Sequence, residues 1–220
     1  MDVTRRRFLA AATVGTVSIA GCIEGELADT SYDCEVNEPA SVPNPSQPAI
    51  GDKTAPVTVQ VYHDYSERVS SIFATEVLGE LLKSKVDTGT ARFEFHDLPV
   101  PGEEEWAHQL ASVGRYLFAE HGQDAYRRYL NRIYEHQEDL SWQTVGDIAN
   151  EVGAQPCTVI SHGSWKTYEE QTVNDKDDAL AAGINEVPSI VVNGQRLHGL
   201  APVSESYQQI ADVIDDHSQA

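Results

Sequence analysis

Residues 182–194 read AGINEVPSIVVNG, and three signals of local structure follow one another within this stretch. Gly183 can adopt the left-handed conformation that commonly ends a helix. Residues 189–192 form a short apolar run rich in β-branched side chains, which is typical of a strand. Asn193-Gly194 is the strongest short sequence signal for a hairpin turn. The stretch therefore predicts the end of a helix, a strand and a hairpin in immediate succession.

The segments before and after this stretch supply the remaining elements. Residues 57–62 (VTVQVY) and 91–96 (ARFEFH) alternate apolar and polar side chains, which predicts two strands. Between them, the apolar residues from 69 to 81 share one face of a predicted helix, namely Val69, Ile72, Phe73, Val77 and Leu81. Helical spacing runs from 104 to about 182 and returns from 203 to 214. The predicted order is strand, helix, strand, a helical block, two strands and a closing helix.

This order resembles the DsbA-like branch of the thioredoxin superfamily, and the resemblance covers roughly residue 55 to the C-terminus. Residues 55–59 (APVTV) resemble the opening strand of that family, and residues 62–65 (YHDY) its aromatic-Asp-aromatic approach to a C-P-x-C motif. Residues 182–194 resemble its segment G-(V/I)-x-x-(T/V)-P-(T/S)-x-x-(V/I)-(N/D)-G. The resemblance implies an α/β thioredoxin-like fold with a DsbA-type helical insertion at about residues 102–182.

The same resemblance implies a peptide-binding loop at Val187 and Pro188. In the family, the proline at this position is cis and faces the active-site helix, and its loop leaves backbone groups able to pair with an extended peptide. Cis bonds form only about 5% of X-Pro bonds in folded proteins, so the expectation is a sharp one. The alternative is an ordinary trans proline that begins an edge strand.

The catalytic motif departs from the family. Glu67-Arg68-Val69-Ser70 occupies the register of C-P-x-C, with Glu67 at the nucleophilic cysteine and Ser70 at the resolving one. Thiol–disulfide exchange requires a thiolate that attacks a disulfide, so dithiol catalysis is excluded at this site. A helix N-terminus would stabilise the Glu67 carboxylate by about 0.3–1 kcal/mol. In the simpler interpretation, which we favour, Glu67 and Ser70 are merely good residues for a first helical turn.

Other chemistry at this end of the fold has weaker support. His63, Asp64, His96 and Asp97 lie near predicted strand ends, where they and Glu67 could in principle hold a metal ion. No metal-ligand spacing such as H-x-x-x-H occurs, and Ser70 lies in no G-x-S-x-G elbow. We therefore expect no metal, no cofactor and no serine hydrolase. We expect the remaining histidines at the surface: His108, His121, His136, His162, His198 and His217.

The N-terminus has the pattern of an export signal. Arg5 and Arg6 precede a short apolar run, which resembles a twin-arginine signal. Residues 19–22 (IAGC) resemble a lipobox, which implies cleavage before Cys22 and a lipid on its sulfur. The alternative is an uncleaved N-terminal anchor helix, which would place the protein at the same location in the cell. We expect a signal at 1–21, an acidic, proline-rich tether at 22–54 and the folded domain at 55–217.

Charge and cysteine content limit the partners. The chain has 35 acidic and 15 basic residues, a net charge of −20, and the lack of a basic patch argues against nucleic-acid binding. High acidity with few lysines suggests a haloarchaeal protein, although an ordinary acidic protein fits as well. Cys34 and Cys157 can form a structural disulfide in an oxidising compartment or remain two unrelated thiols.

Together these observations predict a membrane-anchored, extracytoplasmic protein of the DsbA family that binds an extended peptide or an envelope protein without catalysis. The alternative is an enzyme. It would be either an oxidoreductase that uses the cysteines of a partner, or a different activity built on Glu67 and Ser70.

Overall fold

The computed structural model describes residues 30–40, 45–101, 104–200 and 202–219. Its centre is a five-stranded sheet in the order β1-β3-β2-β4-β5, in which β2 and β3 are parallel and the other neighbours antiparallel. The strands are β1 (Ala49–Ile50), β2 (Val57–His63), β3 (Ala91–Asp97), β4 (Ser189–Val192) and β5 (Gln195–Arg196). The thioredoxin-like fold class is thereby confirmed.

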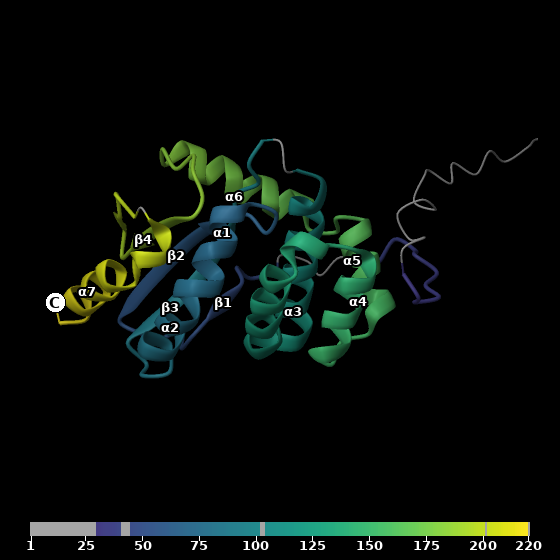
Figure 1. Ribbon diagram of the computed structural model, residues 1–220, viewed down its shortest axis with the longest axis horizontal. Coiled ribbons are helices and arrows are strands. Elements are labelled where there is room, and N and C mark those ends of the chain that lie inside the picture. Colours follow the sequence, from purple (N-terminus) through teal and green to yellow (C-terminus); the bar gives the residue numbers. More distant parts are fainter. Residues whose placement is uncertain (1–29, 41–44, 102–103, 201, 220) are drawn as a thin grey trace, which may run out of the picture.

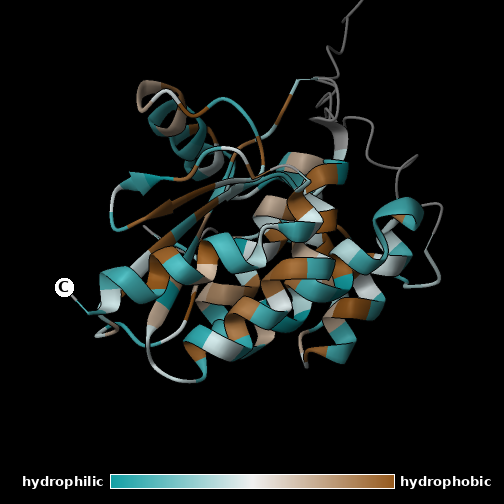
Figure 2. Cartoon of the chain, turned by 60° about the vertical axis from the view of Figure 1, so that its left-hand side comes forward, coloured by the Kyte–Doolittle hydropathy of each residue, from teal (hydrophilic) through white to brown (hydrophobic). Residues whose placement is uncertain are grey.

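The central strand shows why alternation predicted the sheet. Val59 on β2 pairs with Phe93 on one side and Val192 on the other, and all three side chains are fully buried. Because successive side chains of a strand point to opposite faces, apolar residues at every second position fill one layer of the core. Figure 2 shows the apolar residues along the interior strands, with mixed colouring on the helices around them.

The helix after β2 is a continuous helical stretch from residue 68 to 86. It consists of α1 (Arg68–Phe73), α2 (Gly79–Leu81) and two π-type segments, Ala74–Leu78 and Leu82–Val86. Phe73, Val77 and Leu81 are buried as the apolar spacing predicts, but Val69 is 38% exposed. Val69 lies in the first turn, where its side chain lines a surface hollow together with Val187 and Pro188.

The helical insertion, which the helical spacing from residue 104 predicts, begins with one kinked helix. α3 (Glu104–Glu135) continues through Gly122, whose φ of 78° and ψ of −177° are not helical. A positive φ is easily reached only without a Cβ, so the glycine allows the axis to change direction there. The other helices are α4 (Trp142–Glu151), α5 (Pro156–Ser164), α6 (Glu169–Ala181) and α7 (Tyr207–Ser218). Figure 1 shows α3, α4 and α5 grouped beyond β1, with α7 at the other end.

The ordered part begins earlier than residue 55, where the sequence predicts the domain to start. β1 pairs antiparallel with β3, and the Phe95 amide donates to the Pro48 carbonyl at 2.9 Å. Residues 49–50 are only two apolar residues between a proline and polar residues, and so short a run does not predict a strand. They pair because the outer edge of β3 offers unpaired backbone groups that need partners. Within the described residues, no helix is long and apolar enough to cross a bilayer.

Candidate functional site

The candidate site begins where β2 ends, at a tight turn organised by Asp64. One carboxylate oxygen of Asp64 accepts from the Ser66 backbone amide at 2.8 Å and from the Ser66 hydroxyl at 2.7 Å. The other oxygen accepts from the Val100 amide at 2.8 Å, which ties the turn to the segment after β3. Burial raises the pKa of Asp64, while the bonds from Ser66 and Val100 oppose that rise. Asp64 therefore shapes the approach to α1.

Glu67 is the residue that caps α1. Its backbone is extended, and its side-chain carboxylate accepts from the Ser70 amide at 2.7 Å. The carboxylate thus satisfies one of the amides that a helix start leaves unpaired. Ser70 lies beneath the cap, only 1% exposed, and its hydroxyl oxygen accepts from the Asp64 amide at 3.3 Å. Glu67 and Ser70, which the sequence resemblance aligns with the family's two cysteines, therefore serve as a helix cap and a buried hydroxyl.

The cis-proline loop forms an open cleft together with the first turn of α1. The Val187–Pro188 peptide bond is cis. The loop is supported from behind, because the Ser189 hydroxyl donates to the Glu186 carbonyl at 2.7 Å. The cleft has a volume of about 320 Å³ and also contains the exposed side chain of Val69. Its remaining walls are Leu197, His198, Gly199, Leu200 and Val203. A cleft beside a strand end that presents apolar side chains such as Val69, Val187 and Leu197 among polar ones can accept an extended chain.

His63 lies behind α1 and is sealed from solvent. Its Nδ1 lies 2.7 Å from the Tyr134 hydroxyl, which donates to the Asp64 carbonyl at 3.2 Å. Nδ1 therefore carries the proton, and Nε2 has no hydrogen-bond partner among the described residues. Burial lowers the pKa of His63 to about 3. A void of only about 10 Å³ contacts both His63 and Ser70, so no substrate can reach a Ser–His pair there.

His96 and Asp97 join a different cluster, built with residues of the helical insertion. Arg115 of α3 donates from Nε to Asp97 at 2.7 Å and from Nη2 to Asp175 of α6 at 2.5 Å. His96 lies 3.6 Å from Asp175 and stacks on the Tyr62 ring at 4.8 Å. No sequence signal pointed to Arg115 or Asp175, since each lies alone on a helical segment with no motif around it.

The electrostatics of this cluster follow from the buried guanidinium. Burial raises the pKa of Asp97, and the charge of Arg115 opposes that rise. Burial acts on Asp175 in the same direction, but the bond from His96 and the charge of Arg115 outweigh it and lower the pKa of that carboxyl. Arg115 thus serves as an internal counterion that holds α3 and α6 against the edge of the sheet. Across the part of the chain that the structure describes, no three His, Cys, Asp or Glu side chains are grouped to hold a metal ion.

The remaining residues singled out by sequence lie elsewhere. Cys34 and Cys157 form a disulfide with an S–S distance of 2.10 Å. Arg5, Arg6 and Cys22 fall outside the described residues. The prediction of a surface position is wrong for His162, which is 4% exposed and stacks on Tyr116 at 4.0 Å. Aromatic packing in the insertion encloses it, and burial lowers its pKa to about 4.

A second hollow of about 640 Å³ opens near β1 and Gly122. It is wider than the cis-proline cleft, but none of the residues singled out by sequence lines it. Its lining includes four charged residues, Asp52, Lys53, Arg92 and Glu94, and the last two are paired with each other. We therefore take the cleft at the cis-proline as the candidate site, because the helix cap and the supported loop meet there.

Comparisons with known proteins agree with this geometry. Residues 43–216 match a family model described as "Thioredoxin". Disulfide bond formation protein D of Bacillus subtilis (strain 168) is 25% identical over 175 residues, which cover 77% of this chain and 76% of that protein.

Three solved structures share the fold. BdbD from Bacillus subtilis, in its oxidised form, superposes with a TM-score of 0.69 at 23% identity, covering 84% of this chain and 100% of BdbD. Alpha-DsbA1 from Wolbachia pipientis has a TM-score of 0.66 at 17% identity, with 81% and 94% of the two chains covered. A periplasmic thioredoxin-like protein from Salmonella enterica serovar Typhimurium has a TM-score of 0.63 at 17% identity, with 81% and 93% covered.

Proposed function

We propose, from the premise that this chain belongs to the thioredoxin family, that it is a non-catalytic binding module of the cell envelope. Its ligand is an extended peptide or an unfolded segment of an envelope protein, held in the cleft beside the cis-proline. The observation that carries the proposal is the contrast within one site. The cleft is open and apolar at Val69 and Val187, whereas the two catalytic positions are taken by a helix cap and a buried hydroxyl.

The cleft supports peptide binding through shape and polarity. Val69 is exposed beside Val187 and Pro188, so an apolar side chain of a ligand can lose water against all three. The cleft adjoins the start of β4, where an extended ligand could form backbone hydrogen bonds as an added strand does. Glu186 stands at the rim and is paired with Arg196 at 3.1 Å, so its charge is partly balanced.

The absence of sulfur supports a role in binding over exchange. A carboxylate and a hydroxyl cannot form the mixed disulfide through which exchange proceeds. The Glu67 carboxylate is also engaged with the Ser70 amide, so it is committed to holding the helix start. In the described residues the sulfur atoms of Cys34 and Cys157 are already joined in a disulfide away from this cleft.

We place the protein outside the cytoplasm as a lipoprotein, on the basis of Arg5, Arg6 and the lipobox that ends at Cys22. A similar solved structure is described as periplasmic, and a relative as a disulfide bond formation protein. An intramolecular disulfide also suits an oxidising compartment. The acidic composition suits a haloarchaeal cell surface, where a large net charge keeps a protein soluble.

A binding measurement tests the cleft directly. The probe is fluorescein-labelled, reduced and carboxymethylated α-lactalbumin, a permanently unfolded chain, followed by fluorescence anisotropy. Val69→Asp puts a charge among the apolar side chains of the cleft, and we expect it to weaken binding by about tenfold or more. Val173→Asp is the matched control, since Val173 is 41% exposed on α6 and lies outside the cleft. Equal affinities of the two variants would show that the ligand binds elsewhere.

An insulin-reduction assay tests the absence of catalysis. We expect no acceleration over the uncatalysed rate. Robust turnover that survives replacement of Cys34 and Cys157 by serine would overturn the non-catalytic assignment. The converse variant carries Glu67→Cys and Ser70→Cys, and we expect it to gain thiol–disulfide exchange. A folded double variant that stays inert would contradict the register assigned to the motif.

A further inference from the structure

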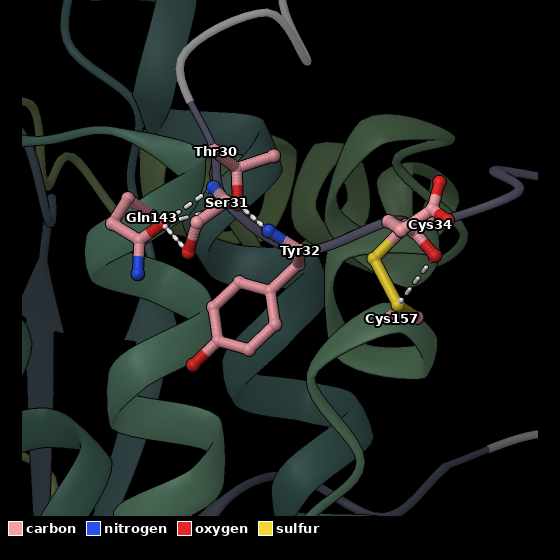
Figure 3. The surroundings of a disulfide bond; sticks show 7 residues. Thr30, Ser31, Tyr32, Cys34, Gln143 and Cys157 are labelled. Carbon is pink, nitrogen blue, oxygen red and sulfur yellow. Dashed lines mark hydrogen bonds between the residues drawn. A yellow bond between two sulfur atoms is a disulfide. The ribbon is translucent and has the colours of Figure 1, made fainter.

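A short strap, residues 30–36, lies across the helical insertion and is fastened at both ends (Figure 3). At one end, the Gln143 side-chain oxygen of α4 accepts from the Ser31 amide at 2.7 Å and from the Ser31 hydroxyl at 2.9 Å. At the other end, the disulfide joins Cys34 to Cys157 in the first turn of α5. The strap therefore bridges α4 and α5.

The middle of the strap is fitted to α4. The Tyr32 hydroxyl donates to the Asp147 carboxylate at 2.7 Å, and its ring covers Gly146. A Cβ added at Gly146 would lie 2.4 Å from a ring carbon of Tyr32, which is closer than atoms can approach. Because Gly146 has no side chain, the tyrosine ring can pack directly against α4 at this position.

The strap changes how much chain separates Cys22 from the folded domain. With the strap docked, eight residues run from Cys22 to Thr30, and they can span at most about 26–29 Å. If the strap were released, the first residue bonded to the sheet would be Gln47, whose side-chain amide donates to the Phe95 carbonyl, and it is 25 residues from Cys22. That length can span roughly 83–90 Å, about three times as far.

We infer that the Cys34–Cys157 disulfide sets the length of the membrane tether and turns the α4–α5 face of the domain toward the lipid surface. This inference rests on the proposed lipid at Cys22. Figure 1 shows β4, which follows the cis-proline, toward the opposite end of the long axis from α4 and α5. A tether fixed at α4 and α5 therefore leaves the cleft directed away from the bilayer, where unfolded envelope proteins can reach it.

The disulfide is the decisive fastening because it is covalent, whereas the strap is otherwise held by the half-buried side chains of Tyr32 and Val36 and by hydrogen bonds. The bonds from Ser31 to Gln143 and from Tyr32 to Asp147 lie at the surface, where water competes for the same groups. A covalent bond between Cys34 and Cys157 holds the strap however often those hydrogen bonds open. Reduction by a dithiol transfers two electrons and two protons to this pair, leaves two thiols and oxidises the dithiol.

Energy transfer in the full chain tests the tether length. The chain has three cysteines, so Cys22 is the single thiol left to label when the disulfide is intact. A dansyl acceptor on Cys22 reports transfer from the tryptophans, all of which lie in or beside the helical insertion: Trp106, Trp142 and Trp165. The test variant carries Cys34→Ser and Cys157→Ser, in which Cys22 is again the single thiol.

We expect the transfer efficiency to fall by about half or more in the serine variant, since the maximal separation rises about threefold. The same fall is expected when the labelled native chain is treated with dithiothreitol, which gives a second route should the variant fold poorly. Gln143→Ala keeps the disulfide and removes only hydrogen bonds, so its efficiency should match the native value. Unchanged transfer after reduction, or an equal loss in Gln143→Ala, would overturn the inference. Peptide affinity of the cleft is measured separately, so either proposal can fail alone.

Discussion

His63 should make the folded state sensitive to acid. The side chain is completely enclosed, with Tyr134 on Nδ1 and apolar neighbours around the rest of the ring, Phe95 among them. Burial lowers the pKa of His63 from 6.5 to about 3. The folded protein therefore holds the neutral ring, whereas the unfolded chain binds a proton readily below pH 6.5. The contribution of His63 to stability is complete above the unfolded pKa and is lost as the pH falls from about 6.5 toward 3.

The size of the effect follows from the two pKa values. At pH 5 the unfolded state gains the free energy of protonating a group of pKa 6.5, while the folded state gains almost none. The difference amounts to about 2 kcal/mol relative to pH 7.5. That is a large share of the roughly 5–15 kcal/mol by which domains of ordinary size are stable.

Urea unfolding at pH 7.5 and pH 5.0, at constant ionic strength, measures this loss. His63→Gln retains a polar group beside Tyr134 and removes the titration, so its stability should fall by about 2 kcal/mol less than that of the native protein over this interval. His121→Gln is the matched control, because His121 is exposed, and it should behave like the native chain. If native protein and His63→Gln lose the same free energy, the ring is not held neutral by burial and the reasoning fails.

Three further variants, one of them with a matched control, test the parts that hold the domain together. Replacing Cys34 and Cys157 by serine should lower the free energy of unfolding by up to about 4.9 kcal/mol. This is the loop-closure entropy for the 123-residue separation of the disulfide. A loss below about 1 kcal/mol in urea unfolding would contradict this prediction. Arg115→Met should lower the free energy of unfolding by about 3–5 kcal/mol, because it leaves buried carboxylates unpaired. The control Arg127→Met breaks an exposed pair and should lower it by only about 0–1 kcal/mol. Similar losses in the two variants would refute the role of the buried guanidinium. Glu67→Ala should cost about 0.5–2 kcal/mol through loss of the helix cap, and an unchanged melting temperature would argue against that cap.

Local patterns predicted most of the secondary structure. Alternation in residues 57–62 and 91–96 predicted β2 and β3, because a strand that buries one face needs an apolar side chain at every second position. Residues 182–194 predicted β4 and its hairpin through turn chemistry that depends only on neighbouring residues. The resemblance carried by these segments was sufficient for the thioredoxin-like fold class.

Contacts between distant residues were not predictable in the same way. Arg115 and Asp175 lie 60 positions apart and meet because α3 and α6 pack against the same edge of the sheet. β1 forms because β3 has an open edge, and not because residues 49–50 favour a strand. The strap is held by the packing of the Tyr32 ring over Gly146 and by a disulfide whose two cysteines are separated by 123 positions. No local periodicity encodes such pairings.

The sequence by itself determined what chemistry is absent. The sequence contains no C-x-x-C, and this spacing is absent whatever the surrounding structure, because covalent reactivity depends on which atoms are present. Tertiary structure decided what residues 67–70 do instead, since only the fold places the Glu67 carboxylate on the helix start and Val69 in the cleft beside Pro188. The physical reason is the distance along the chain over which each kind of interaction acts. Strand alternation and turn chemistry act over a few bonds, whereas a cleft, a buried ion pair and a fastened strap exist only once segments far apart in the chain have packed together.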